Sequence, residues 1–262
     1  MKRNLKPIVL PLAFLPISVG ATEVVDDFSP FSILSLDSSF VFCSWVRMAQ
    51  NEVPVFRAGQ RNSKRMGLSA RWAPADSVSL RIQGERQWVN WPDGTSETGW
   101  GDLRLGTSGR LFEGGLDFLP ALWVDWVVKL PNAQDESGLG TDETDAYLSL
   151  VALWEKGAWG AGLRGGLAIW GDPLQFANQD DAALFAIHFK HVGEHHKLSA
   201  TLDWQKSSPR NASRTSLLGG GQIKGLPGCL WMGVEGGVGL NPAAPDWQAG
   251  LLFGLDVPCR SE

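Results

Sequence analysis

The chain has 262 residues, with 23 basic and 28 acidic side chains and a formal net charge of −5. This acidic balance, without a basic block, argues against nucleic-acid binding, which needs a positive surface. The apolar content excludes intrinsic disorder. Charged residues make up only 19%, while glycine (31 residues) and tryptophan (13 residues) are frequent.

The first 21 residues have the layout of a secretory signal peptide. Basic residues Lys2, Arg3 and Lys6 precede an apolar run from Ile8 to Ile17, and small residues follow at positions 19–21. The run is too short for a spanning helix, and its two prolines disfavour a buried strand. We predict export with residues 1–21 as signal peptide. The sequence predicts no definite structure for residues 22–52, because Phe40–Val46 fits a further strand, a short plug or a periplasmic arm equally well.

From residue 53 to residue 262 we predict a single all-β domain. No stretch of ten or more residues repeats with the helical period of 3.6. The predicted strands are Val53–Gln60, Lys64–Ala73, Ser77–Asn90, Thr98–Phe112, Gly115–Leu130, Asp145–Lys156, Ala158–Gly171, Asp181–Val192, His195–Lys206, Ser213–Gly225, Cys229–Leu240 and Asp246–Asp256.

Most of these strands alternate apolar with polar or small residues, as between Leu198 and Gln205. Each strand therefore has one apolar and one polar face. A soluble β-sandwich gives the same alternation with its apolar faces turned inward. Two features favour the inverted arrangement: the strands exceed the usual five or six residues, and the apolar phase excludes charge, which facing lipid would cost about 2–4 kcal/mol.

Connection lengths and tryptophan positions point the same way. Short connections (Pro74–Asp76, Glu113–Gly114, Gly157, Gly193–Glu194, Leu226–Gly228) alternate with longer ones (Pro131–Thr144, Asp172–Asp180, Asn241–Pro245). Tryptophans 72, 154 and 159 lie near short turns, and tryptophans 88, 91, 126, 170, 204 and 247 near long loops. Segregated loops and two aromatic girdles are typical of an up-and-down transmembrane barrel of about 12 antiparallel strands.

The polar phase of the strands is predicted to line the barrel interior. Its candidate residues are Arg81, Gln83, Glu85, Arg104, Asp117, Asp125, Arg164, Asp203 and Glu235. Both signs of charge are present, so neighbouring strands can pair them. Two interpretations stay open: a narrow polar passage, or a plug of salt bridges that fills a small barrel.

Two further clusters contain residue types that can bind metal ions. The loop residues Asp135, Glu136, Asp142, Glu143 and Asp145 could bind a hard cation, but their spacing is not that of an EF-hand and favours a solvated acidic loop. The four histidines, at 188, 191, 195 and 196, surround one short turn and favour a charge-dense turn over a metal site. We predict no metal and no cofactor. Because no nucleophile elbow, phosphate loop or carboxylate pair appears, we predict no enzyme.

The cysteines allow a more specific prediction. If the last two strands form a hairpin, Cys229 and Cys259 lie near each other at its periplasmic end, in an oxidising compartment. We predict a disulfide between them, which leaves Cys43 outside the pair. The alternative is two free thiols.

Three blocks of sequence occur in an order typical of one family. They are Gly101-Asp102-Leu103-Arg104-Leu105-Gly106, Lys129-Leu130-Pro131 and Gly138-Leu139-Gly140-Thr141-Asp142-Glu143-Thr144-Asp145. From Lys64 to Asp256 the chain resembles the outer-membrane barrels labelled as belonging to the MetA pathway of phenol degradation. It differs at Asn132-Ala133, where that family more often has Thr-Gly. The resemblance implies a transporter-like role for small hydrophobic or aromatic compounds.

Together these observations predict a passive channel in the outer membrane of a Gram-negative bacterium. Its partners would be membrane lipid and a small solute, with no nucleic acid. Two alternatives remain: a non-conducting barrel with a structural or surface-binding role, and a soluble periplasmic β-sandwich that binds a ligand.

Overall fold

The computed structural model describes residues 39–258, apart from 53–60, 115–118, 134–138, 141–142, 172–180, 207–212 and 225–229. Thirteen strands form a single sheet: β1 (Ser39–Glu52), β2 (Arg61–Ala75), β3 (Val78–Asn90), β4 (Ser96–Trp100), β5 (Leu103–Phe112), β6 (Ala121–Leu130), β7 (Asp145–Lys156), β8 (Trp159–Ile169), β9 (Ala182–Val192), β10 (His196–Lys206), β11 (Arg214–Lys224), β12 (Leu230–Gly239) and β13 (Trp247–Pro258). Within the described segments, no helix is both long and apolar enough to cross a membrane.

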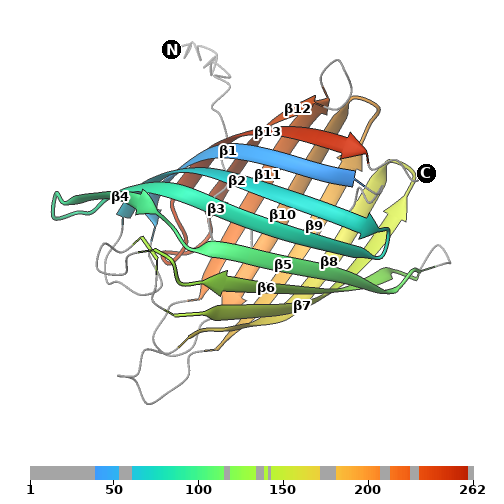
Figure 1. Cartoon of the computed structure of the whole chain (residues 1–262), viewed down its shortest axis with the longest axis horizontal. Coiled ribbons are helices and arrows are strands. Elements are labelled where there is room, and N and C mark those ends of the chain that lie inside the picture. The colour runs from blue at the N-terminus through green and yellow to red at the C-terminus, as the bar shows by residue number, and fades with distance from the viewer. Residues whose placement is uncertain are drawn as a thin grey trace, which may run out of the picture.

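The sheet closes on itself into a barrel (Figure 1). Strands β5 to β13 each pair with the next strand in sequence, β13 pairs with β1, β1 with β2, and β2 with β3, all antiparallel. Both β4 and β5 pair with β3, so they form one wall strand interrupted at Gly101 and Asp102. The thirteen segments therefore build a barrel of 12 strands, which confirms the predicted fold class and excludes the sandwich.

The barrel begins earlier than the predicted boundary at residue 53. Strand β1 pairs with β13 from Ser39–Pro258 to Gln50–Trp247, and it pairs with β2 on its other side. Of the three interpretations of Phe40–Val46, the further strand is therefore correct. The sequence could not decide this, because one of the two partners of β1 is β13, at the other end of the chain. The predicted strand Val53–Gln60 lies outside the described residues.

Connection lengths largely follow the predicted alternation. Two residues join β2 to β3 and β7 to β8, whereas 14 join β6 to β7 and 12 join β8 to β9. The exception is the connection from β5 to β6, which covers residues 113–120, because β6 begins at Ala121 rather than at the predicted Gly115. Pro120 stands directly before β6, where a residue without an N–H group is tolerated.

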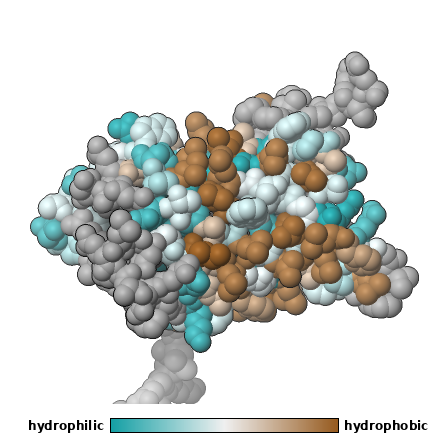
Figure 2. Space-filling view, turned by 60° about the horizontal axis from the view of Figure 1, so that its bottom comes forward, coloured by the Kyte–Doolittle hydropathy of each residue, from teal (hydrophilic) through white to brown (hydrophobic). Residues whose placement is uncertain are grey.

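The two faces of the wall have opposite chemistry. Leu122, Trp126 and Leu251 are 40%, 53% and 48% exposed on the outside, whereas Arg81 and Asp203 are 8% and 2% exposed on the inside. In Figure 2, hydrophobic side chains gather over the body of the wall between more hydrophilic ends. Charged side chains are costly where the wall faces lipid, whereas apolar side chains are not. The charged residues therefore lie inside the barrel, and the apolar residues face outward.

The tryptophans follow the predicted girdles in part. Trp72 and Trp159 are exposed near the short-turn end, and Trp88, Trp126 and Trp247 are exposed toward the other end. Trp91 and Trp170 were also predicted for a girdle, but both are buried. They lie at the long-loop end among side chains from neighbouring strands and connections. Proximity to a strand end did not reveal which face each residue takes.

Candidate functional site

The interior of the barrel is the candidate functional site, and it holds most of the predicted polar residues. Arg81, Gln83, Glu85, Arg104, Asp125, Arg164 and Asp203 are buried on the inner wall, and Glu235 is half-buried there. Asp117 lies outside the described residues. The structure therefore brings eight of the nine candidates to one surface.

A recurring arrangement is an ion pair between two strands that lie on either side of a third strand. Arg164 on β8 donates from Nη2 to Oδ1 of Asp203 on β10, at 2.7 Å. The register aligns both residues with Ala186 of β9, which lies between them. Because Ala186 has only a methyl group, the two long side chains meet above it.

Two other ion pairs use the same arrangement with glycine in the middle. Lys190 of β9 pairs with Glu155 of β7 across Gly160. A Cβ atom on Gly160 would collide with the lysine side chain. The high glycine content of the sequence therefore has a structural cause here: an inward glycine leaves room for a side chain that crosses its strand.

The third ion pair of this kind joins β1 to β12, near the C-terminal end of the chain. Arg47 of β1 pairs with Glu235 of β12 across Gly250 of β13. The Glu235 carboxylate lies where a Cβ atom of residue 250 would be. This pair bridges the seam at which the N-terminal and C-terminal strands close the barrel.

A fourth crossing pair is offset by two residues along the strands. Arg81 of β3 pairs with Asp125 of β6, and Ser108 of the intervening β5 donates its hydroxyl to the same carboxylate. Arg81 Nη2 also lies 3.3 Å from the Ser108 oxygen. Together, the four pairs crosslink the inner wall between strands that share no backbone hydrogen bonds.

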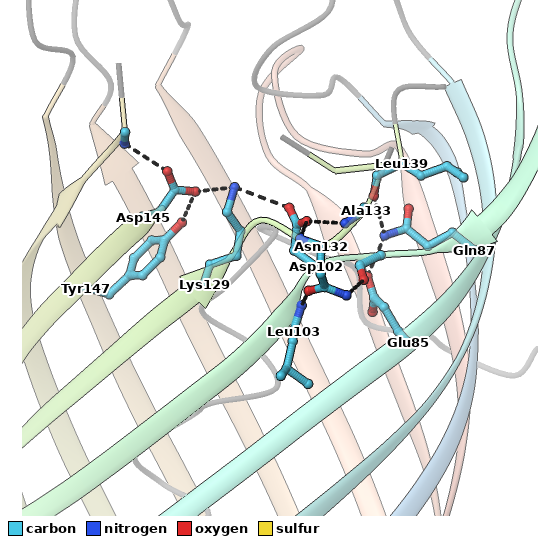
Figure 3. A network of polar contacts seen from close by, with 12 residues as sticks. Glu85, Gln87, Asp102, Leu103, Lys129, Asn132, Ala133, Leu139, Asp145 and Tyr147 are labelled. Carbon is cyan, nitrogen blue, oxygen red and sulfur yellow. Dashed lines mark hydrogen bonds and ion pairs between the residues drawn. The ribbon is translucent and has the colours of Figure 1, made fainter. Parts of the chain in front are cut away.

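The long-loop end carries a different kind of network, shown in Figure 3. Lys129 Nζ lies between two carboxylates, 2.6 Å from Asp145 Oδ2 and 3.4 Å from Asp102 Oδ2. Asp145 also accepts hydrogen bonds from the Gly171 amide at 3.0 Å and from the Tyr147 hydroxyl at 3.4 Å. The lysine thus joins β6 and β7 to the break between β4 and β5.

Asp102 fixes the start of the long connection from β6 to β7. Its Oδ1 accepts from the backbone amides of Asn132 at 3.2 Å and Ala133 at 3.0 Å. The Asn132 side chain in turn accepts from the Leu103 amide and donates to the Gly101 carbonyl at 3.4 Å. The strand break at Gly101-Asp102 therefore exposes backbone and side-chain groups that hold the connection.

Part of this connection packs into the end of the barrel. Leu139 and Ala133 are buried in an apolar cluster with Val89 and Trp91. The amide of Gln87 donates to the Leu139 carbonyl at 3.2 Å and to Glu85 Oε1 at 2.7 Å (Figure 3). We call this set the mouth cluster: Asp102, Lys129, Asn132, Ala133, Leu139, Gly140 and Asp145.

The mouth cluster brings together the three sequence blocks that carried the family resemblance. A Cβ atom on Gly140, in the third block, would lie 2.6 Å from Asp102 Oδ1 in the first block and would collide with Ala133. The second block supplies Lys129. The departure at Asn132-Ala133 is compatible with this packing, because Asp102 is bound by the backbone amides of both residues.

Two residues of the predicted acidic loop fall within the described residues. Asp145 is buried in its ion pair with Lys129, and Glu143 is half-buried. Asp135, Glu136 and Asp142 lie outside the described residues. In the part of the chain that the structure describes, no three or more His, Cys, Asp or Glu side chains are grouped to hold a metal ion.

The four histidines have different surroundings. His188 is buried, with its Nδ1 2.7 Å from the Thr201 hydroxyl. The His191 ring contacts the rings of Trp159 and His196, with centroids 4.6 Å and 5.3 Å away. His195 is exposed beside Glu194. Cys229 and Cys259 lie outside the described residues, so their disulfide stays a prediction.

Sequence reasoning missed several inward cations, namely Arg47, Arg61, Arg65, Arg71, Lys129, Lys190 and Arg214. The signal that could have found them was the same alternation. Arg65 and Arg71, for example, are buried in β2, while Met66 and Leu68 between them are exposed. Applying the period of two to every strand assigns these residues to the inner face.

A closed antiparallel barrel with an apolar outside and a charged inside is the architecture of outer-membrane β-barrels. Solved structures agree with this class. An outer membrane channel from Pseudomonas putida F1 superposes with a TM-score of 0.64 at 13% identity, covering 84% of this chain and 96% of that one. The NanC porin gives 0.57 at 8% identity, with 84% and 100% covered.

A third similar structure is the translocator domain of the autotransporter NalP from Neisseria meningitidis. Its TM-score is 0.56 at 9% identity, with 86% of this chain and 91% of that one covered. No protein-family model matches the chain, and no curated protein matches its sequence significantly. At these identities the likeness concerns the fold alone, which resembles that of outer-membrane β-barrels.

Proposed function

We propose that this protein is a passive channel for small solutes in the outer membrane of a Gram-negative bacterium. The observation that carries the proposal is the inversion of the wall, with leucines and tryptophans outside and ionised side chains inside. Ionised groups on a lipid face are costly, whereas in a wet interior they are solvated and can interact with a passing solute. Selection would follow from the width of the interior and the charges along it.

The resemblance to barrels of phenol degradation supports small aromatic or hydrophobic compounds as solutes. The inner wall adds a requirement of its own. A compound that passes Arg81, Asp125, Arg164 and Asp203 moves along charged groups rather than along an apolar surface. An aromatic compound that carries a polar or charged group fits this surface better than a plain hydrocarbon.

A second candidate function is a non-conducting barrel with a structural role. It is favoured by the close packing inside, where the ion-paired side chains of Arg164 and Asp203 are only 4% and 3% exposed. A solvated passage beside them would leave more of their surface accessible. Ion pairs that link strands two apart would also stiffen such a barrel.

Liposome swelling separates the two functions. The purified, detergent-folded protein is reconstituted in vesicles, and the folded state is checked by its heat-modifiable mobility on a gel. We expect swelling in isotonic solutions of small solutes, at a rate that decreases as solute size increases. Vesicles that contain folded protein but admit no solute of any class would exclude the channel and support the structural barrel.

A further inference from the structure

The outer face of the wall carries a pair of charged side chains away from the strand ends. Lys64 lies inside β2 and Arg86 inside β3, and both are exposed on the face that carries the leucines and tryptophans. Among the described side chains of all thirteen strands, the other outward lysines, arginines or acids are Lys156 and Lys206, the last residues of β7 and β10. A charge that faces lipid costs stability, so two such charges inside the strands point to a ligand that offsets the cost.

The register makes these two cations diagonal neighbours on adjacent strands. Lys64 is directly opposite Trp88, and Arg86 is directly opposite Met66. Long side chains in diagonal positions of two paired strands are close enough to reach one ligand together. The Arg86 guanidinium also lies over the Trp88 ring, 5.7 Å from its centroid. This contact keeps the arginine beside the residue that faces Lys64.

Lys64 is also part of a groove on the outer face at the long-loop end. The groove has a volume of about 270 Å³ and crosses from β13 over β1 and β2 to β3, which lie side by side in Figure 1. The ladder between β1 and β2 has a register shift between Ala49 and Glu52, and such a bulge bends a strand. The Trp247 indole donates to the side-chain oxygen of Gln50 and so joins β13 to β1 within the groove. The outward residues that line the groove are Met48, Gln50, Asn62, Lys64, Asn90 and Trp247.

The groove combines polar, cationic and apolar groups in an order along the strands. Gln50, Asn62 and Asn90 place amide groups nearest the long loops. Lys64 lies one outward position deeper, directly opposite the exposed Met48 of β1. Among the described residues that line the groove, none is acidic. A ligand that matches this order is an amphiphile with an anionic head group and an apolar chain.

We propose that this groove binds lipopolysaccharide, the phosphorylated glycolipid of the outer leaflet. The long loops of outer-membrane barrels face the outside of the cell, and exposed tryptophans such as Trp88 and Trp247 lie at the level of the lipid head groups. At that level Lys64 and Arg86 can bind one phosphate group by charge-assisted hydrogen bonds. The neighbouring amides suit sugar hydroxyl groups, and Met48 suits an acyl chain. The inference goes beyond the proposed solute transport and requires only the outer-membrane location, so it also applies to a barrel that does not conduct.

The test is native mass spectrometry of the folded protein in detergent, with one lipid added at a time. We expect diphosphoryl lipid A to bind at least about fivefold more tightly than phosphatidylglycerol, because two cations and several amides recognise phosphate together with sugar. Phosphatidylcholine, which has no net charge, should bind most weakly. Raising the ionic strength should reduce the preference, since exposed charges are screened by salt.

Variants assign the binding to the groove. The double variant Lys64→Gln with Arg86→Gln removes both charges and should weaken lipid A binding at least about fivefold. Lys64→Arg with Arg86→Lys keeps both charges and should retain most of the binding. The matched control, Lys156→Gln with Lys206→Gln, removes two charges from the outer face of β7 and β10, which lie away from β1, β2 and β3 in the sheet. It should leave lipid A binding unchanged.

Stability in vesicles gives a second measurement that depends on the membrane. In phosphatidylcholine alone, Lys64→Gln with Arg86→Gln should leave the urea midpoint unchanged or raise it, because two uncompensated charges are removed from the lipid face. Adding lipid A should raise the midpoint of the native protein and not that of the double variant, since a ligand stabilises the state that binds it.

The outcomes decide both the ligand and its site. Equal binding of lipid A and phosphatidylglycerol overturns the glycolipid as ligand, and equal losses in the two double variants overturn the groove as its site. If the groove variant does not fold, the order of lipid affinities and the midpoint shift of the native protein still decide. None of these measurements involves conductance, so a negative result leaves the channel proposal intact, and a barrel without conductance leaves the lipid site intact.

Discussion

The outer and inner faces of the barrel wall are built from the same strands but obey different rules. On β9, Phe185 and Phe189 face outward and are 41% and 57% exposed. On the inner face of the same strand, Ala186 stands between Arg164 and Asp203, and Lys190 reaches Glu155. The outer face needs side chains that are apolar, whereas the inner face needs a particular size and charge at each position.

This difference has a physical reason. Lipid is a fluid solvent that adapts to the shape of any apolar side chain, so an outward position is defined by hydrophobicity alone. Inside, each ionised group must find its counter-charge at a fixed distance, and the residue in between must leave space for it. Three substitutions test this contrast. Each is compared with a control substitution on the outer face of the barrel.

The largest effect is expected at the centre of a crossing ion pair. Ala186→Leu puts a branched side chain between Arg164 and Asp203 and leaves two buried charges separated, which should lower the free energy of unfolding by about 3–5 kcal/mol. Ala183→Leu adds the same group to the outer face of β9 and should change little. Urea unfolding in lipid vesicles, followed by tryptophan fluorescence, measures both.

A double-mutant cycle sharpens this result. In a background of Arg164→Gln with Asp203→Asn, no charge is left to be separated, so Ala186→Leu should cost only its steric strain, about 1–3 kcal/mol. An undiminished cost in that background would show that crowding alone explains the loss.

The second effect concerns the outer face. Leu150 lies in the middle of β7 and is 60% exposed. Leu150→Arg places a charge in lipid and should lower the free energy of unfolding by about 2–4 kcal/mol. Leu150→Phe keeps the position apolar and should be nearly neutral in the same vesicle assay. Comparable losses for both variants would mean that this position depends on shape, against the rule stated for the outer face.

The third and smallest effect is expected in the mouth cluster. Gly140→Ala sets a methyl group against Asp102 and Ala133 and should cost about 1–3 kcal/mol by overpacking. The connection from β6 to β7 should then be cleaved faster by a glutamate-specific protease, because Glu136 and Glu143 lie in it. Gly165→Ala, on the outer face of β8 with no atom within 4 Å of the new methyl group, is the control. Unchanged cleavage of Gly140→Ala would show that the packing does not hold the connection.

The strands themselves were largely predictable from the sequence. The prediction Asp145–Lys156 matches β7 residue for residue, and most other strands differ by at most three residues at either end. The period of two is a local signal, set by the backbone geometry of an extended chain, so it is visible wherever apolar and polar residues alternate. It failed at the start of β6, where Leu119 and Pro120 continue the predicted strand but precede the observed one.

The site was predictable only as a surface. The alternation assigned Arg81, Asp125, Arg164 and Asp203 to the inner face, but it did not pair them. Arg164 and Asp203 are 39 residues apart in the chain. Their meeting depends on the register of β9 against both neighbours, and a shift by one residue would turn every inner side chain outward.

By itself, the sequence determined that this protein is a set of long amphipathic strands with an apolar face suited to lipid, because that information is local and repeats every second residue. Only the tertiary structure decided that β1 closes the barrel against β13 and that Asp102 holds the connection beyond β6. Each of these depends on ring closure and register, which join residues that lie far apart in the chain.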